Sequence, residues 1–370
     1  MTQYKIQHFV PQWYQRNFSP DINKDGKDEH IWVYDLKSDK IELSKIYETA
    51  QKEYFYGKDG EFEKSLQLIE TGTARAVNTI IKNENLDGLA DSTRKNLFKF
   101  LLLQSTRTES SKVIVENLHE KYVEYFIKLR LRLYEKSPGY NPFIESLKKD
   151  ENLFQYAMKI ALASVIAISD LKPFLLINKT EIPFFTSDYP VVVNNYNYKK
   201  MRLGTNTLGI QIICPITDKI CLLLIHSELY RIIGYKQSKI EISADTDIDS
   251  INYLQILNCY RKVFSKQNNL EYIRTIRENT LKIRENNKLP QVENGDDDNL
   301  ERNYATRFSF LKNTPKCGAI ISQYAKDSYK ANEKLLFRNK NLLDKARSQT
   351  DSIIASYIDE YRSKLERNSP

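Results

Sequence analysis

The amino-acid sequence predicts an α+β fold. In this fold a mostly antiparallel sheet, formed by the third quarter of the chain, packs with an N-terminal β-hairpin and with central helices. A C-terminal helical extension follows. Three patterns predict it. Apolar and polar residues alternate in two stretches near the N-terminus, apolar residues recur every three or four positions between residues 60 and 136, and short β-favouring runs fill the third quarter. Alternation is typical of half-buried strands, and the longer spacing is typical of amphipathic helices.

The N-terminal segment is predicted to form a short strand, a short helix and the hairpin. Pro11 suits the first turn of a helix that ends near Phe18, and Tyr14 shares one apolar face with Phe18. The alternating stretches 30–36 and 40–46 flank a Lys-Ser-Asp-Lys turn. Such an arrangement predicts two antiparallel strands.

The loop before the hairpin resembles the opening of a calcium-binding loop. Asp21, Asn23, Asp25 and Gly26 match its first half, but Trp32 stands at the twelfth position. Because that position needs a bidentate Glu, we expect a polar turn and assign no metal site.

The stretch after the hairpin turns helical. One helix is predicted from about Gly60, and a second from 92 to about 134, with a possible break at 108–111. Pro and Gly residues end this region, and a further helix is predicted at 153–168.

The third quarter is rich in β-branched and aromatic residues separated by turn residues, which indicates strands. The predicted strands are 173–180, 182–188, 190–195, 208–216 and 219–226.

The last third returns to helical periodicity. A helix is predicted at 250–266. The organisation we expect is an α+β domain over residues 1–288, a polar acidic linker at 289–303 and a helical extension of two helices within 304–370. The terminal helices could hold the chain in a homo-oligomer.

Charge indicates a class of partner without deciding it. Lys and Arg number 56 and Asp and Glu 48, which gives a net charge of +8. Such a balance favours nucleic acid or a nucleotide as partner. The positive charge is spread along the chain, so a solvated cationic surface explains it equally well.

Cysteine usage and apolar runs indicate the compartment. The four Cys form no C-x-x-C pair and lie beside apolar stretches, which indicates buried thiols in a reducing compartment. The N-terminus has no signal-peptide pattern and the apolar runs are too short to span a bilayer, so we expect a cytoplasmic protein without a membrane partner. No cofactor motif is present, and the cofactor stays unknown.

Seven segments occur in an order that matches one protein family. They are QHFVPQWYQRNF, IWVYDLKSDKI, EYFYGKDGEFEKSLQLIE, FLLLQSTRT, PFFTSDYPVVV, CPITDKICLLL and INYLQILNCYRKVFS. Over about residues 3–270 the chain thereby resembles domain of unknown function 4238, an uncharacterised and largely bacterial family. The resemblance implies a domain extent and no established activity. The occurrence of its members as accessory genes of bacteria and mobile elements favours a role in phage defence or as a toxin-like effector.

Polar residues from three distant parts of the chain are predicted to converge on one pocket. His8 stands just outside a helix N-terminus, where free backbone N–H groups favour an anion, and it could act as general acid or base. Arg107 could hold a phosphate, and Asp188 follows a predicted strand, where sites are often built. The predicted catalytic residues are His8, Arg107 and Asp188, and the predicted substrate-binding residues are Gln12, Arg16, Gln104 and Ser187.

Each of these residues also has a structural interpretation. The His8 ring could hydrogen-bond a backbone carbonyl, and Asp188 could close a turn before proline. Glu63 and Glu70 could supply metal-binding carboxylates beside Asp188, but salt bridges to Arg107 or Arg75 explain them more simply. A polar pair on a core-facing helix stripe must in any case be satisfied by protein groups or by a ligand.

Two functions from different classes remain open. The first is a hydrolase or nuclease acting on a phosphodiester or nucleotide, with His8 as acid or base. The second is a non-catalytic module that binds nucleic acid or a protein, as a sensor or an assembly protein. Salt-dependent affinity for nucleic acid that His8→Ala leaves unchanged would favour the second.

Overall fold

The computed structural model is mixed α+β. It describes residues 5–21, 29–58, 60–87, 89–117, 152–195, 206–234, 238–286, 308–315 and 338–367.

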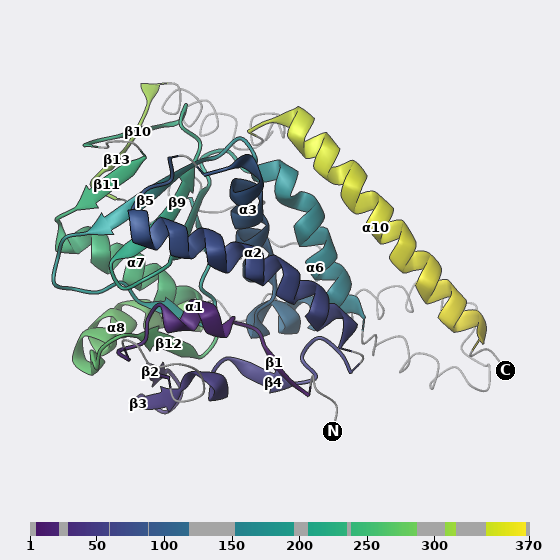
Figure 1. Cartoon of the computed structure of the whole chain (residues 1–370), viewed down its shortest axis with the longest axis horizontal. Coiled ribbons are helices and arrows are strands. Elements are labelled where there is room, and N and C mark those ends of the chain that lie inside the picture. Colours follow the sequence, from purple (N-terminus) through teal and green to yellow (C-terminus); the bar gives the residue numbers. More distant parts are fainter. Residues whose placement is uncertain are drawn as a thin grey trace.

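The N-terminal strands lie at the lower edge of Figure 1. Strand β1 (Ile6–His8) pairs antiparallel with β4 (Gln51–Glu53), and the short helix α1 (Gln12–Arg16) follows β1. The predicted hairpin is confirmed as β2 (His30–Asp35) and β3 (Lys40–Lys45). A 3-10 turn, η2, covers Ile46–Glu48.

Helix α1 is shorter than predicted. It ends at Arg16, and Phe18 lies two residues beyond it. Phe18 is nevertheless buried against Tyr14, with ring centroids 5.7 Å apart. The apolar pairing was therefore correct although the helix boundary was not.

A four-stranded sheet joins the hairpin to two later strands, in the order β3-β2-β12-β6. Strand β6 is Thr186–Ser187 and β12 is Lys262–Ser265, and both neighbours of β12 are antiparallel to it.

The predicted helix at 250–266 is wrong in its second half. Helix α7 (Asp245–Asn258) ends at Cys259, whose φ of −61° and ψ of 147° are extended, and residues 262–265 form a strand. Val263 and Phe264 are both buried in the sheet and pair with β2. Tertiary pairing therefore overrides the helical spacing of the local sequence.

A second sheet has five strands in the order β11-β5-β9-β8-β7. Its neighbours are antiparallel except for the parallel pair of β11 and β5. The strands are β5 (Lys172–Asn178), β7 (Val192–Asn194), β8 (Gln211–Pro215), β9 (Ile220–Ile225) and β11 (Lys239–Ile242). The predicted, mostly antiparallel sheet is confirmed.

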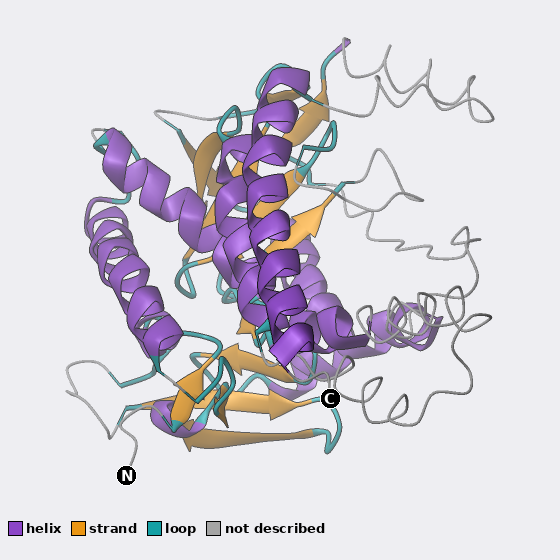
Figure 2. Cartoon of the chain, turned by 90° about the vertical axis from the view of Figure 1, so that its right-hand side faces the viewer, coloured by secondary structure: helices purple, strands orange, loops and turns teal. Residues whose placement is uncertain are grey.

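Helices cover both faces of this sheet. One face packs against α2 (Glu61–Asn83), α3 (Asp91–Thr106) and α6 (Leu153–Ala163), and the other packs against α7. Alternate strand residues belong to the two cores, as for Leu175 and Leu176. Because both faces are buried, the strands are apolar throughout rather than alternating. Figures 1 and 2 show the helices against the strands.

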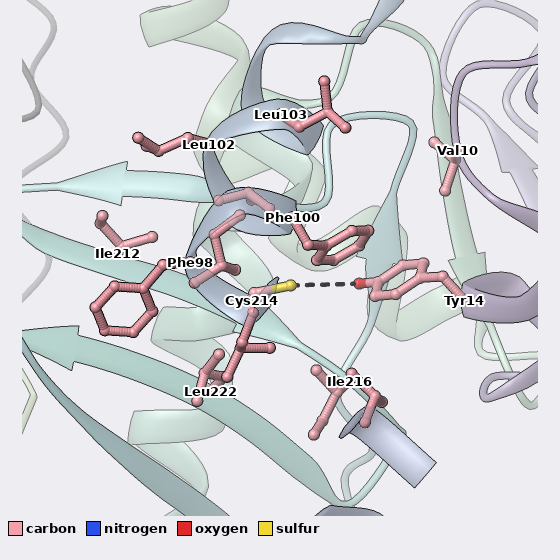
Figure 3. Packing of buried hydrophobic residues seen from close by; sticks show 14 of the residues in the cluster. Val10, Tyr14, Phe98, Phe100, Leu102, Leu103, Ile212, Cys214, Ile216 and Leu222 are labelled. Carbon is pink, nitrogen blue, oxygen red and sulfur yellow. Dashed lines mark hydrogen bonds between the residues drawn. The ribbon is translucent and has the colours of Figure 1, made fainter. Parts of the chain in front are cut away.

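Tyr14 of α1 reaches into the first core, beside Phe100 of α3 (Figure 3). Its hydroxyl donates to the Pro215 carbonyl at 2.5 Å and lies 2.7 Å from Thr186 Oγ1 and 4.0 Å from Cys214 Sγ. One side chain thereby ties α1 to strands of both sheets.

The predicted break in the second long helix is present. Helix α3 ends at Thr106, Arg107 takes φ −81° and ψ 40°, and the chain is helical again over 109–117. The rest of the helix predicted to about 134 lies outside the described residues, as does the predicted linker at 289–303.

The C-terminal segment supplies a strand as well as a helix. Strand β13 (Leu311–Asn313) pairs with β10 (Tyr230–Ile232). Helix α10 (Lys340–Arg367) runs along α6 and the 3-10 turn η3 (Ser164–Ile168), on the outer side of the molecule in Figure 1.

A last helix, α8 (Leu270–Asn286), packs against α7. Among the helices of the described part of the chain, none is long and apolar enough to cross a membrane.

Candidate functional site

Arg107 is the centre of a buried polar group that we name the Arg107 cluster, consisting of His8, Tyr56, Glu63, Glu70 and Arg107. Its side chain is 1% exposed because the end of α3 turns Arg107 toward β1. Its Nε donates to the Tyr56 hydroxyl at 3.0 Å, Nη1 to Glu70 Oε1 at 2.5 Å and Nη2 to the His8 carbonyl at 2.7 Å. The guanidinium is therefore largely occupied by protein groups, and the predicted salt bridge with Glu70 is present.

Gln104 and Arg107 together hold the chain just before α1. Gln104 lies one turn earlier on α3, is fully buried, and donates from Nε2 to the Phe9 carbonyl at 2.9 Å. The Gln104 Oε1 atom is buried without a partner among the described residues. Both polar side chains on the apolar stripe of α3 thus satisfy backbone carbonyls of residues 8 and 9.

His8 belongs to the cluster through its backbone and to α1 through its ring. Its Nε2 lies 3.1 Å from the Tyr47 carbonyl, so Nε2–H donates there and Nδ1 is left as the acceptor. The Gln12 amide nitrogen stands 3.5 Å from Nδ1, and Gln12 Oε1 lies 3.5 Å from an Arg16 nitrogen. Burial lowers the pKa of His8, with smaller contributions from the positive charges of Arg107 and Arg16. The imidazole is therefore neutral near pH 7.

Glu63 is the unsatisfied member of the Arg107 cluster. Its Oε2 is buried without a hydrogen-bond partner among the described residues. Burial raises the pKa of Glu63 to about 7, and the negative charge of Glu70 adds to the rise while Arg107 opposes it. The Glu63 carboxyl therefore binds a proton more tightly than an exposed glutamate does, in the field of the Arg107 and Glu70 charges.

Asp188 directly follows β6. It is 3% exposed, and its carboxylate accepts from the backbone N–H groups of Tyr260, Arg261 and Lys262 at 2.7, 2.7 and 2.8 Å. Burial raises the pKa of Asp188 to about 6, although the three N–H donors lower it. Both oxygens therefore hold the segment between α7 and β12, and at neutral pH the group is a carboxylate.

Hydrogen bonds connect five of the predicted pocket residues around the start of α1, namely His8, Gln12, Arg16, Gln104 and Arg107. Ser187 and Asp188 have other partners, and the Ser187 hydroxyl bonds Gln255 Oε1 at 3.0 Å. Within the described part of the chain, no hydrogen bond or ion pair joins His8 to Asp188.

Asp188 lines a cleft that the sequence alone did not indicate. This cation-lined cleft has a volume of about 630 Å³. Five cationic and two acidic side chains are among its lining residues, so its wall carries an excess of positive charge. The lining residues are Phe9, Leu36, Lys37, Ala50, Gln51, Lys52, Glu109, Asp188, Tyr260, Arg261, Lys262, Arg277 and Leu281.

Three of the five cations are paired. Lys52 meets Glu109 at 2.5 Å, Arg261 meets Asp35 at 2.6 Å and Arg277 meets Asp39 at 3.1 Å.

The other two cations of the cleft, Lys37 and Lys262, have no acidic partner for their ammonium groups among the described residues. Two lysines without acidic partners in the lining of one cleft favour an anion there.

The family described as Protein of unknown function (DUF4238) matches residues 6–269. The chain belongs to the DUF4238 family. No curated protein and no solved structure matches the chain significantly.

The DUF4238 region contains the Arg107 cluster and Asp188 with the backbone segment that it holds. Two residues of the cleft wall, Arg277 and Leu281 of α8, lie beyond the matched region.

Within the described residues of this DUF4238 member, no group of three His, Cys, Asp or Glu side chains is placed to hold a metal ion. Of the calcium-like loop, Asp21 accepts from the backbone N–H of His30 at 2.9 Å and lies 3.1 Å from His30 Nδ1. Asn23, Asp25 and Gly26 of that loop lie outside the described residues. Asp21 therefore closes the loop onto β2.

Sequence reasoning missed the cations of the cleft because they come from four separate segments. Lys37 is in the hairpin turn, Lys52 on β4, Arg261 and Lys262 before and in β12, and Arg277 on α8. The run Tyr-Arg-Lys at 260–262 was the one local signal, since an aromatic residue beside two cations is typical of nucleic-acid contacts.

Proposed function

We propose that this protein binds a phosphate-bearing ligand, a nucleotide or a nucleic acid, in the cation-lined cleft. The observation that carries the proposal is the pair of unpartnered ammonium groups, Lys37 and Lys262, on a wall that also contains Arg261 and Arg277. Lys and Arg side chains on a concave surface attract phosphates and release their counterions. The net charge of +8 adds long-range attraction of the same sign.

In this proposal Asp188 and Arg107 have structural roles. Asp188 fixes the backbone of residues 260–262, which presents two cations to the cleft. The Arg107 guanidinium donates hydrogen bonds to Tyr56, Glu70 and His8. A phosphate would therefore have to displace these protein groups to bind it.

Charge reversal in the cleft tests the proposal. We expect Lys37→Glu combined with Lys262→Glu to weaken binding of a fluorescein-labelled twelve-nucleotide strand by about tenfold or more. A plot of log affinity against log salt has a negative slope. For a single strand, this slope should become shallower by about 0.7 for each phosphate that the variant no longer neutralises. Fluorescence anisotropy at several salt concentrations measures both quantities.

The matched control reverses two exposed lysines on α3, Lys95 and Lys99, which lie outside the cleft lining. This variant carries the same net charge as the cleft variant. Equal loss of affinity in the two variants would show that only net charge matters and would overturn the cleft as the binding site.

A second candidate function, hydrolysis of a phosphodiester or nucleotide, is favoured by the state of His8. Its imidazole is neutral, with Nδ1 as acceptor. Glu63 belongs to the same cluster, and its pKa is raised to about 7. A neutral imidazole can accept a proton, and a carboxyl group with a pKa of about 7 can give or take one at pH 7. In this candidate the protein would act as a defence or toxin-like effector.

Expression of wild type beside His8→Ala tests the second candidate. Hydrolysis predicts growth arrest and altered RNA, DNA or nucleotide pools for the wild type alone. Binding of nucleic acid that is equal in both proteins, with intact pools, would instead favour the non-catalytic module.

A further inference from the structure

One exposed aromatic residue stands in the cation-lined cleft. Seven large hydrophobic side chains are exposed within the described part of the chain, and Tyr260, at 36%, is the member of this set that lines the cleft. The other lining aromatic, Phe9, is buried in the core. Nucleic-acid bases stack on aromatic side chains that lie among cations in an open groove, and Tyr260 is a partly exposed aromatic residue in such a lining.

The backbone that carries this ring is fixed. Asp188 bonds the N–H of Tyr260 and of the next two residues, and β12 then pairs with β2 and β6. A tyrosine on a fixed backbone loses little conformational freedom on binding, so its contact area contributes efficiently to affinity.

We infer that the ligand is a single-stranded nucleic acid, with one base stacked on Tyr260 and neighbouring phosphates bound by Lys37 and Lys262. The inference rests on the proposed function and names its substrate class. Tyr260, Arg261 and Lys262 are consecutive, and all three line the same cleft, so a ring and cations stand close together there.

Two related ligands fit the cleft less well. A duplex keeps its base faces stacked inside the helix, so it offers none to Tyr260. A free nucleotide is usually bound in a site that encloses most of its surface. Here the Lys52 and Arg261 side chains are each 51% exposed, which leaves the cleft open for a ligand that continues beyond it.

Base stacking is tested with two strands that carry the same phosphates. The first probe is a fluorescein-labelled strand of twelve thymidines, and the second is an abasic strand of equal length. We expect the wild type to bind the thymidine strand about 5- to 100-fold more tightly than the abasic strand, the range that one stacked base supplies. A twelve-base-pair duplex and ATP should both compete more weakly than the thymidine strand.

The variants assign the difference to one ring. Tyr260→Ala should bind the two strands equally, whereas Tyr260→Phe should keep the wild-type preference. Tyr47→Ala is the matched control, because Tyr47 is 37% exposed and lies outside the cleft lining. Its preference should equal that of the wild type.

The outcomes separate this inference from the proposed function. If both strands bind the wild type equally while charge reversal of Lys37 and Lys262 weakens both, phosphate binding stands and base stacking is wrong. If neither strand responds to that charge reversal, both proposals fall. If ATP or the duplex competes more strongly than the thymidine strand, that molecule is the better ligand and the inference of a single strand is wrong. The comparison of two probes on wild type needs no variant, so a folding defect cannot obscure it.

Discussion

Asp188 shows how a residue that resembles a catalytic acid can be a structural anchor. One buried carboxylate accepts three backbone N–H groups from a segment more than seventy residues later. Such charge-assisted bonds each contribute about 1.5–3 kcal/mol. In this fold they also hold in place the ring and cations of the proposed ligand site.

Asp188→Ala should lower the free energy of unfolding by about 3 kcal/mol or more, because three buried N–H groups lose their acceptor. Urea unfolding followed by circular dichroism measures the change. Glu241→Ala is the control, since its carboxylate is exposed and only loosely paired with Lys179 at 3.6 Å, and it should change stability by about 0.5 kcal/mol or less. Equal stabilities of the two variants would contradict the anchoring role.

Glu63 predicts a pH dependence of stability with a definite sign. Burial raises the pKa of Glu63 in the folded protein from 4.5 to about 7, so the folded state binds its proton more tightly than the unfolded state does. The contribution of this proton to stability is complete below about pH 4.5 and is lost as the pH rises toward 7.

The substitution Glu63→Gln should remove that dependence. Relative to wild type, the variant should therefore gain thermal stability as the pH rises from 5 to 8. Melting temperatures of both proteins across this range check the prediction. Melting curves that shift in parallel at every pH would show that Glu63 does not titrate there.

At the scale of elements, Arg338 fixes the start of α10. Its side chain is fully buried, pairs with Asp170 at 2.9 Å, and donates to the carbonyls of Ala167 and Thr207. Farther along, Tyr357 of α10 packs on Tyr156 of α6 with ring centroids 4.7 Å apart. The C-terminal helix is thus held to the body of the protein at two points.

Arg338→Ala should release α10, because Asp170 would lose its partner and two carbonyls would lose a donor. Limited trypsin digestion should then cleave within residues 340–367 much faster than in wild type. Arg347→Ala, on an exposed position of the same helix, is the control. If both variants are cut at the wild-type rate, Arg338 does not hold the helix. The predicted homo-oligomer through this tail stays a prediction.

The elements that the sequence predicted correctly are those with long or regular patterns. The β2–β3 hairpin alternates over six residues per strand, and α2 and α3 repeat apolar residues over many turns. Strands β4 and β10 are only three residues long and depend on distant partners, so no local pattern marks them.

For the candidate site, too, the sequence predicted the features that depend on a local pattern and not those that depend on distant partners. The inward direction of Gln104 and Arg107 followed from helical spacing, and both are buried. Their target, the backbone of residues 8 and 9, depends on how β1 is placed against α3 and could not be read locally. The position of Asp188 after a predicted strand marks it in the sequence, but the helical spacing over 250–266 predicts a helix for its partners at 260–262.

At the scale of the whole molecule, folding brings cationic residues that are far apart in the sequence to one cleft. The +8 net charge has no dense run of Lys and Arg in the chain. Nevertheless the hairpin turn, β4, the start of β12 and α8 bring five cations to the wall of one cleft. Sheet pairing between β2 and β12 is the step that brings Lys37 and Lys262 to that wall.

Photocrosslinking tests most directly whether a single strand lies in this cleft. A strand carrying 5-iodouracil is bound to the wild-type protein, irradiated and digested, and the adducts are located by mass spectrometry. We expect an adduct on Tyr260, and we expect Lys37→Glu combined with Lys262→Glu to reduce it strongly. Adducts confined to residues outside the cleft lining would contradict it.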